Sequence, residues 1–296
     1  MSIAVAHWDY ATRGGGEILA EALADGLDAP LVVGHEDPAC HPPGGPPEGL
    51  TELAPDSLWH RWAAKGGLRR ALAQMMLWRD HADRELSLFD VVVTSGNEPQ
   101  WWMPREDQTV LAYTHTTPRW MYDLNHNERG MVTRTITQLK RWIFQQELAT
   151  GIDLWVANSD IVARRISKYW GTENVRTVYP PIETEALGPE QADTEDFYLM
   201  LCRLAPIKRV RQAVLAAKER EFTLKIAGSG PLRPELEAIA PDNVEFLGWV
   251  GPDRKRELLA GAKAYINCCM DETFGMSVVE SMASGTPVIT VDEGMP

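Results

Sequence analysis

The chain of 296 residues is long enough for two domains, and its 44% of hydrophobic residues excludes a disordered protein. With 29 basic against 42 acidic residues, the net charge of -13 argues against nucleic acid as a partner, because phosphate backbones bind to basic surfaces. Eight of the basic residues are lysines, and an acid-rich, lysine-poor surface that stays hydrated in high salt favours a halophilic source.

Neither the cysteines nor the apolar runs indicate an extracellular or membrane-spanning protein. The four cysteines (Cys40, Cys202, Cys268 and Cys269) form no CxxC pair and no metal-ligand spacing with histidine, so we expect buried thiols in a reducing cytosol. Asp9 interrupts the first apolar run, and no stretch approaches the roughly 18–20 apolar residues that span a bilayer. We therefore expect a cytoplasmic protein, soluble or peripheral at the inner face of the cell membrane.

Short apolar runs alternate with longer amphipathic segments, which is typical of a doubly wound parallel α/β sheet. Strands are expected in the first half at 3–6, 91–94, 110–113 and 154–157, and in the second half at 198–202, 223–227, 244–246, 264–268 and 287–291. Pro180 and Pro181 stand between the halves, followed by an acidic stretch at 183–196. Because prolines disfavour helix and acidic groups favour solvation, we expect a linker between two domains, 1–182 and 183–296.

Candidate site residues of the first half follow its strands, because ligands of open α/β sheets bind beyond the carboxyl ends of the strands. Gly15 and Gly16 open an amphipathic helix, where they allow a ligand near the backbone and leave N–H groups for an anion; a simple tight turn is the alternative. His115 follows the strand at 110–113, either as a site residue or as a structural histidine. The absence of GxGxxG and GxxxxGK[ST] patterns removes the main support for a dinucleotide or P-loop enzyme.

In the second half, cations and a glycine follow the strands. Arg203 and Lys208 come after the strand at 198–202, and two fixed cations at a strand end suit a diphosphate, with solvated surface cations as the alternative. Gly228 follows the next strand and permits close approach of a backbone.

Two carboxylates flank the start of the last expected helix. Glu272 lies on the preceding loop and Glu280 about one turn into the helix, whose N–H groups near Gly275 and Ser277 suit a phosphate. Each carboxylate can accept hydrogen bonds from vicinal hydroxyls. The pattern therefore describes a ligand with a sugar on both sides of a diphosphate, although carboxylates are also common as caps and surface groups.

These positions together resemble glycosyltransferase family 4, the retaining nucleotide-sugar transferases of GT-B fold. The resembling stretches are 14–17 (GGGE), 113–119 (YTHTTPR), 156–159 (VANS) with 165–166 (RI), 179–182 (YPPI), 203–208 (RLAPIK), 226–231 (IAGSGP), 243–249 (NVEFLGW) and the Glu-x7-Glu stretch 272–289 (ETFGMSVVESMASGTPVI). The resemblance implies the α/β class, with two Rossmann-like doubly wound domains facing a cleft that holds the donor.

The resemblance also implies a role for each candidate. Glu280 would hold the ribose hydroxyls of the nucleotide, and Glu272 would contact hydroxyls of the donor sugar. Arg203 and Lys208 would neutralise the leaving diphosphate. His115 would orient the transferred sugar or stabilise developing positive charge from the acceptor side. The base of the nucleotide would lie against Trp249 and Val250. The remaining implied donor contacts are backbone groups at Gly15, Gly16, Gly228, Phe274, Gly275, Met276 and Ser277.

Members of the family retain the anomeric configuration and need no catalytic metal, so no cofactor is expected. The sequence agrees, because it contains no Asp-x-Asp. The stretch around His115, with Pro118, Arg119 and Asp123, is most similar to bacterial and archaeal mannosyltransferases, which favours GDP-mannose over a UDP-sugar as donor. The expected function is hexosyl transfer, with mannose favoured, to a glycan or lipid-linked acceptor.

Family members usually continue well beyond the strand at 287–291, whereas this sequence stops at Pro296. We therefore expect a truncated second domain whose sheet lacks an edge partner. Two alternatives follow: a non-catalytic truncated GT-B partner protein, and a nucleotide-sugar 2-epimerase, which shares the fold and releases its sugar. The presence of Arg203, Lys208, Glu272 and Glu280 favours the transferase.

The stretch 58–79 is basic and aromatic. It contains no acidic residue and includes Arg61, Lys65, Arg69, Arg70 and Arg79 together with Trp59, Trp62 and Trp78. A basic, aromatic, amphipathic face suits an anionic membrane surface, where lipid-linked acceptors of the family reside. The alternative is a helix of the first domain whose tryptophans belong to the core.

Overall fold

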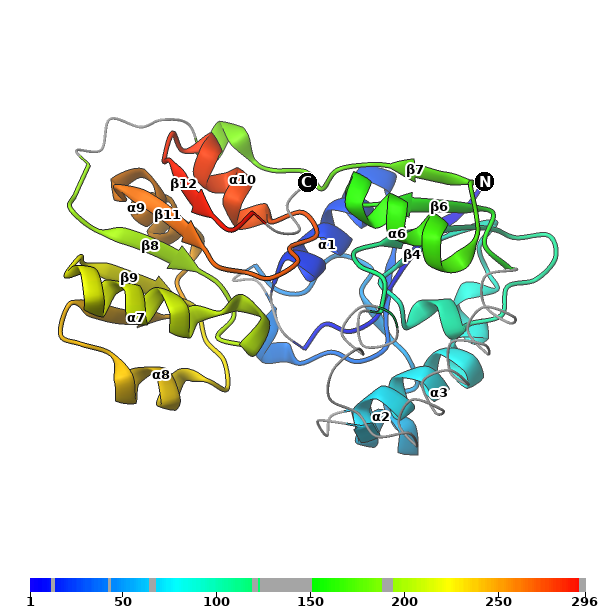
Figure 1. Cartoon of the computed structure of the whole chain (residues 1–296). Coiled ribbons are helices and arrows are strands. Elements are labelled where there is room, and N and C mark those ends of the chain that lie inside the picture. Colours follow the sequence, from blue (N-terminus) through cyan, green and yellow to red (C-terminus); the bar gives the residue numbers. More distant parts are fainter. Residues whose placement is uncertain are drawn as a thin grey trace, which may run out of the picture. The chain divides into compact units, whose positions relative to one another are not determined.

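Figure 1 shows the computed structural model of the chain, which describes residues 1–11, 14–41, 44–63, 68–118, 122, 151–187 and 194–292. The chain divides into two compact units, Met1–Pro180 and Pro181–Pro296. Each unit contains one parallel sheet with its own hydrophobic core.

The first unit contains a seven-stranded sheet in the order β3-β2-β1-β4-β5-β6-β7, with every pair parallel. Its strands are β1 (Ile3–His7), β2 (Leu31–Val33), β3 (Thr51–Glu52), β4 (Val91–Ser95), β5 (Thr109–Thr114), β6 (Leu154–Ala157) and β7 (Val175–Thr177). Its described helices include α1 (Gly15–Leu27), α2 (Leu58–Ala63), α3 (Leu68–Leu86) and α6 (Asp160–Trp170), and short 3-10 turns cover Pro38–Cys40 and Pro99–Trp101. The order reverses beside β1, which is the point where open α/β sheets bind ligands.

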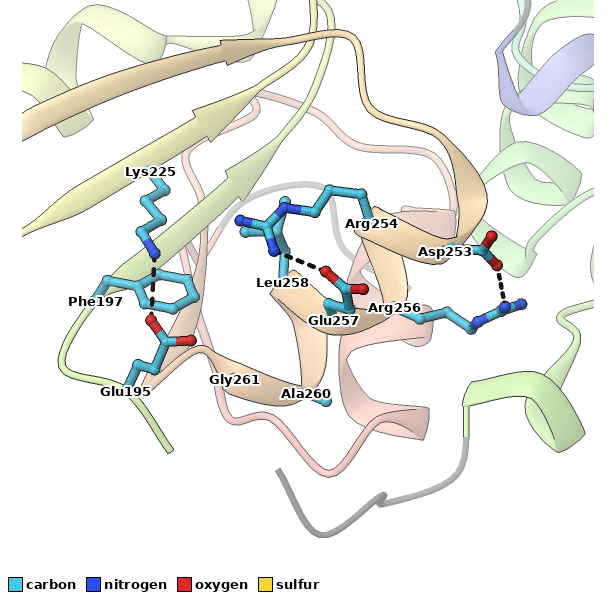
Figure 2. A pocket seen from close by; sticks show the side chains of 10 residues that line it. All are labelled: Glu195, Phe197, Lys225, Asp253, Arg254, Arg256, Glu257, Leu258, Ala260 and Gly261. Carbon is cyan, nitrogen blue, oxygen red and sulfur yellow. Dashed lines mark hydrogen bonds and ion pairs between the residues drawn. The ribbon is translucent and has the colours of Figure 1, made fainter. Parts of the chain in front are cut away.

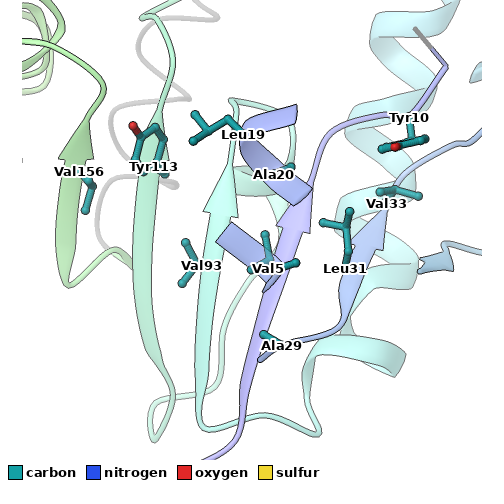
Figure 3. Packing of buried hydrophobic residues seen from close by; sticks show 11 residues of the cluster. Val5, Tyr10, Leu19, Ala20, Ala29, Leu31, Val33, Val93, Tyr113 and Val156 are labelled. Carbon is teal, nitrogen blue, oxygen red and sulfur yellow. The ribbon is translucent and has the colours of Figure 1, made fainter. Parts of the chain in front are cut away.

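Helices cover both faces of this sheet. Val5 of β1 packs in a cluster with Leu19 and Ala20 of α1 (Figure 3), whereas the neighbouring Ala4 packs with Trp78 and Leu86 of α3. Alternate strand residues therefore face opposite helical layers, which explains why the strands read as continuous apolar runs. Burying each large apolar side chain stabilises the unit by roughly 1.5–3 kcal/mol.

The second unit contains a five-stranded parallel sheet in the order β10-β9-β8-β11-β12. Its strands are β8 (Tyr198–Leu201), β9 (Leu224–Ala227), β10 (Val244–Gly248), β11 (Ala264–Asn267) and β12 (Val288–Thr290). Its helices are α7 (Val210–Arg220), α8 (Arg233–Ile239), α9 (Pro252–Gly261) and α10 (Met276–Ala283), with 3-10 turns at Thr184–Leu187 and Pro206–Lys208. Leu199 of β8 packs with Leu258 of α9 and Val278 of α10, and Met200 packs on the other face with Val214 of α7.

The predicted α/β class is confirmed, and all nine expected strands are present within two residues of their expected bounds. The sequence analysis missed β2, β3 and β7, which contain only two or three residues each and therefore show no periodicity. β12 lies at the edge of the second sheet and, among the described strands, pairs with β11 alone. No described helix has the length and apolar character needed to cross a bilayer.

The predicted linker at 183–196 is wrong in part. Thr184–Leu187 forms a 3-10 turn, and the Leu187 side chain is buried in the core of the second unit. The free energy gained by burying this leucine outweighs the tendency of the neighbouring acidic residues to stay in solvent. The backbone of Glu195 is also held, because its N–H donates to the Gly261 carbonyl at 2.8 Å. Residues 188–193 of the expected linker lie outside the described residues.

Candidate functional site

A buried polar chain lies at the carboxyl edge of the first sheet. His7 ends β1 and Ser95 ends β4 in the same parallel register, and His115 follows β5. The Ser95 hydroxyl lies 3.0 Å from His7 Nδ1 and 2.8 Å from His115 Nε2. Because a hydroxyl both donates and accepts, it can link the two rings, one as donor and the other as acceptor.

Glu17 of α1 extends this chain. Its Oε1 lies 3.9 Å from His7 Nε2, and its Oε2 accepts a hydrogen bond from the Gly14 N–H at 2.9 Å. Burial alone would raise the pKa of Glu17, but the His7 ring and the Gly14 and Glu17 backbone outweigh it, so this pKa lies below its ordinary value. The ionised carboxylate therefore lies beside His7 without a hydrogen bond to Nε2, while His7 Nδ1 contacts Ser95.

His115 is uncharged in this setting. Burial, and then the neighbouring His7, lower the pKa of His115 to about 3, with Glu17 opposing the shift. The ring stacks on Trp8 with 6.0 Å between centroids. Ser95 engages Nε2, so Nδ1 is the nitrogen that remains for a ligand.

The start of α1 lies against the same group. Gly15 and Gly16 are its first two residues, as the sequence predicts. A Cβ at Gly16 would lie 3.6 Å from the Trp8 ring, 3.8 Å from His7 and 3.9 Å from His115. The structure thus brings Gly16 and His115 together, and the N–H groups of the first helical turn lie beside the buried polar chain.

In the second unit, Lys208 and Glu272 are in contact. Lys208 ends the 3-10 turn after β8, Glu272 lies between β11 and α10, and the Nζ–Oε2 distance is 2.7 Å. Burial alone would lower the pKa of Lys208, but the Glu272 carboxylate outweighs it and raises this pKa. Burial also raises the pKa of the adjacent Cys202 thiol to about 12, so that thiol stays protonated.

Glu280 also has a lysine partner. It lies in the second turn of α10, and its Oε1 is 2.7 Å from Lys255 Nζ of α9. Glu280 is 13% exposed and Lys255 29% exposed. The sequence analysis missed Lys255, because only the packing of α9 against α10 brings the two positions together.

Gly275 permits the tight turn that begins α10. Its φ of 77° lies in the left-handed region, and a Cβ there would lie 3.2 Å from Glu272 Cγ and 3.3 Å from Val278 Cγ2. Met276 and Ser277 follow as the first helical residues, and Phe274 is buried just before them. The backbone N–H groups at this helix start have no partner within the helix, so they suit an anion.

The other candidates differ in how the structure places them. The Gly228 φ is 135°, and a Cβ there would lie 2.0 Å from the Cys202 carbonyl oxygen, so this glycine is required for packing between strand ends. Arg203 is exposed, and its guanidinium forms no ion pair with any described residue. Trp249 is 64% exposed and Val250 partly buried, directly after β10.

A second polar group lies near the ends of β1 and β4. Asp9 forms an ion pair with Arg70 of α3, and Asn97 Oδ1 and Glu98 Oε2 are buried without a partner among the described residues. Burial raises the pKa of Glu98. Such unsatisfied oxygens suit hydroxyl donors, so Asn97 and Glu98 are candidates for binding a ligand with hydroxyl groups. The rule that sites follow strand ends could have found both residues.

The basic stretch 58–79 is less available than its sequence suggests. Trp78 is fully buried in the core and cannot face a membrane, and Arg70 forms an ion pair with the buried Asp9. The amphipathic pattern arises because α3 packs on the sheet. Arg61 and Arg79 are exposed. Lys65 lies outside the described residues.

A hollow of about 480 Å³ in the second unit lies away from these strand ends (Figure 2). It is lined by the residue before β8, the start of β9 and helix α9, at the amino edge of the sheet. Its charges are already paired, as in Arg254 with Glu257 at 2.7 Å and Lys225 with Glu195 at 3.4 Å. The hollow therefore carries no catalytic arrangement.

Two successive Rossmann-like units, each with one parallel sheet, are the architecture of the GT-B fold. Sucrose-phosphate synthase from Thermosynechococcus elongatus has this fold and matches with a TM-score of 0.67 at 15% identity, over 99% of this chain and 82% of that one. Residues 183–296 match the family model described as Glycosyl transferases group 1, so the second unit is a domain of this family.

Curated relatives carry glycosyltransferase names. Alpha-monoglucosyldiacylglycerol synthase of Streptococcus pneumoniae is 28% identical over 214 residues, which cover 64% of this chain and 47% of that protein. GDP-mannose-dependent alpha-mannosyltransferase of Mycolicibacterium smegmatis is 40% identical over 95 residues, which cover 32% and 25%. The chain thus spans less than half the length of these two relatives. The predicted GT-B fold is confirmed, and the second unit matches a glycosyltransferase domain. The activity of the whole protein, family 4 and mannose remain predictions.

Proposed function

We propose that the protein is a retaining glycosyltransferase of family 4 that moves a hexose from a nucleotide sugar to a glycan or lipid-linked acceptor. Mannose from GDP-mannose is the first candidate donor group, and a UDP-sugar is the second. The observation that carries the proposal is the start of α10, where Glu272 and Glu280 are each held by a lysine. The group 1 domain and the relative named as GDP-mannose-dependent support it.

The donor-side chemistry follows from charge. The diphosphate gains negative charge as the glycosidic bond breaks, and Lys208 with the N–H groups of α10 stabilises that charge without needing a metal. Arg203 supplies a second, exposed cation. Glu272 accepts hydrogen bonds from sugar hydroxyls and Glu280 from the ribose hydroxyls, both as carboxylates already fixed by lysines.

His115 acts as a neutral hydrogen-bonding group. With its pKa lowered to about 3 by burial and His7, the ring carries no charge near neutral pH. It therefore orients the transferred sugar through Nδ1, and a role as a charged catalyst is disfavoured. Glu17, His7 and Ser95 are positioning residues that fix the ring and its proton.

Donor binding and turnover test the proposal. Isothermal titration of the full chain with GDP-mannose, UDP-glucose and ADP-glucose should show binding of one donor, and release of nucleoside diphosphate should require an acceptor. Proton NMR of the product should show the donor's anomeric configuration. Binding without turnover would support the non-catalytic partner, free sugar without acceptor would support the epimerase, and no binding to any donor would refute the donor site.

We also propose peripheral docking on an anionic membrane. Exposed Leu58, Arg61 and Arg79 support it, together with the relative named alpha-monoglucosyldiacylglycerol synthase. Co-sedimentation with phosphatidylglycerol vesicles, against phosphatidylcholine vesicles as control, should show binding that Arg61→Glu weakens. Equal sedimentation with both vesicle types, or none with either, would refute docking.

A further inference from the structure

Two histidines and a glutamate from three separate elements converge in the first unit. His35 lies two residues after β2, Glu52 ends β3, and His60 lies in α2. His35 Nδ1 is 3.1 Å from Glu52 Oε1 and 3.0 Å from His60 Nε2, and the latter is 2.5 Å from the same oxygen. The three side chains are only 13–17% exposed.

Hydrogen bonds alone do not account for this convergence. Glu52 Oε1 faces both ring nitrogens and also accepts the backbone N–H of Glu36 at 2.8 Å. A carboxylate oxygen has about two lone-pair directions, so one of the three nitrogens is in excess. The ring nitrogens also face one another, and two N–H groups aimed at one point would repel. If the lone pairs of the two ring nitrogens and of Glu52 Oε1 point at one shared cation, the oxygen has no surplus donor and the rings no longer direct N–H groups at one another.

We propose that His35, Glu52 and His60 bind a divalent transition-metal ion, with Zn²⁺ the best match. Two imidazoles with one carboxylate suit Zn²⁺ and disfavour Ca²⁺ and Mg²⁺, which prefer oxygen ligands. Tetrahedral Zn²⁺ with bonds of about 2.0–2.2 Å holds its ligand atoms roughly 3.3–3.5 Å apart, so each needs to move by less than about 1 Å. The Glu36 N–H supports the ligating carboxylate from outside.

The ion acts as a clamp on α2. This helix contains six residues, and its tryptophans, Trp59 and Trp62, pack on Ala73 and Leu77 of α3. Coordination joins α2 directly to the ends of β2 and β3, which hydrophobic contacts with α3 do not do. Three protein ligands leave a fourth position for water. The donor residues of the second unit play no part, so the clamp is independent of the proposed sugar transfer.

Zinc binding by the full chain tests the site. After EDTA treatment and desalting, titration of Zn²⁺ against a chromogenic chelator should show one site with a dissociation constant below 1 µM, on the order of known structural sites. His60→Gln and Glu52→Gln should each weaken binding at least 10-fold. His81→Gln, in a histidine of α3 outside the cluster, is the matched control and should bind as the wild type does.

A second readout identifies the ligands. Co²⁺ bound at this site should show d–d absorption without thiolate charge transfer, because the four cysteines are not ligands. At a fixed concentration, Zn²⁺ should raise the melting temperature of the wild type and the His81 control by more than that of the Glu52 variant. If His60→Gln fails to fold by circular dichroism, His35→Gln replaces it. Absence of sub-micromolar binding, unchanged affinity in the folded cluster variants, or a thiolate signal would overturn the proposal.

Discussion

The Glu280→Gln substitution separates ligand binding from folding. Glu280 is assigned to the ribose hydroxyls of the donor, and Lys255 is its only ion-pair partner among the described residues. Glutamine keeps the size of the side chain and one acceptor oxygen but removes the charge. We therefore expect a large loss of donor affinity and a small loss of stability.

The two magnitudes follow from the surroundings of the carboxylate. Hydrogen bonds to a charged group contribute about 1.5–3 kcal/mol, so the loss of charge should cost about 2–3 kcal/mol of donor binding, or about 30- to 150-fold in dissociation constant. The ion pair with the 29% exposed Lys255 is partly screened by solvent and contributes about 1 kcal/mol or less to folding. That corresponds to a decrease of about 5 °C in melting temperature.

Isothermal titration with the bound donor and thermal unfolding measure the two effects. Glu257→Gln is the matched control, because Glu257 also forms an ion pair at 2.7 Å, with Arg254, but is 63% exposed on α9 away from the helix start. It should bind donor normally. If Glu280→Gln binds donor as the wild type does, or loses stability in proportion to affinity, the assignment of this carboxylate to the ribose is refuted.

Three further substitutions and conditions test the geometry. Gly275→Ala should lower the melting temperature by about 5–10 °C, because a residue with a Cβ at φ 77° costs about 1–2 kcal/mol; an unchanged melting curve contradicts this. Ser95→Ala should destabilise the first unit by about 1–3 kcal/mol and lower kcat, since it separates His7 from His115; normal turnover would remove the positioning role. The folded pKa of His115, about 3, lies below its unfolded value of about 6.5, so only the unfolded chain gains a proton between these values and stability falls as pH decreases through this window. In His115→Asn, the free energy of unfolding measured by urea titration should depend less on pH in this window. An equal pH dependence in both proteins would contradict the lowered pKa of His115.

The strand-end rule predicted part of the first-unit site. Gly16 and His115 were identified because each follows an apolar run. In the structure they are neighbours, since a Cβ at Gly16 would lie 3.9 Å from the His115 ring. The same rule applies to His7 and Ser95, which end β1 and β4 in register. The expected strands at 3–6 and 91–94 place both residues directly after a strand, but no local pattern indicates that their side chains contact one another.

Other parts of the sites depend on tertiary packing that no local pattern encodes. Lys255 and Glu280 lie 25 positions apart on two helices, and their contact depends on how α9 packs against α10. The cluster of His35, Glu52 and His60 has separations of 17 and 8 positions, which match no metal motif. His35 and Glu52 lie at the ends of β2 and β3, two strands too short to be recognised in the sequence, so their proximity could not be predicted.

In the proposed donor site, the lysine–carboxylate pairs would allow so acidic a protein to hold a diphosphate. Lys208 and Glu272 cancel one another, so the free site carries no unpaired buried charge, which would be costly. A donor phosphate can take over Lys208, while a sugar hydroxyl replaces the lysine as hydrogen-bond donor to Glu272. Each group thus exchanges one partner for another. The positive potential that attracts the diphosphate comes from exposed Arg203 and the N–H groups of α10. In the proposed donor site, Glu272 would therefore take part in recognition, because its carboxylate raises the pKa of Lys208 and holds this lysine in place until the diphosphate arrives.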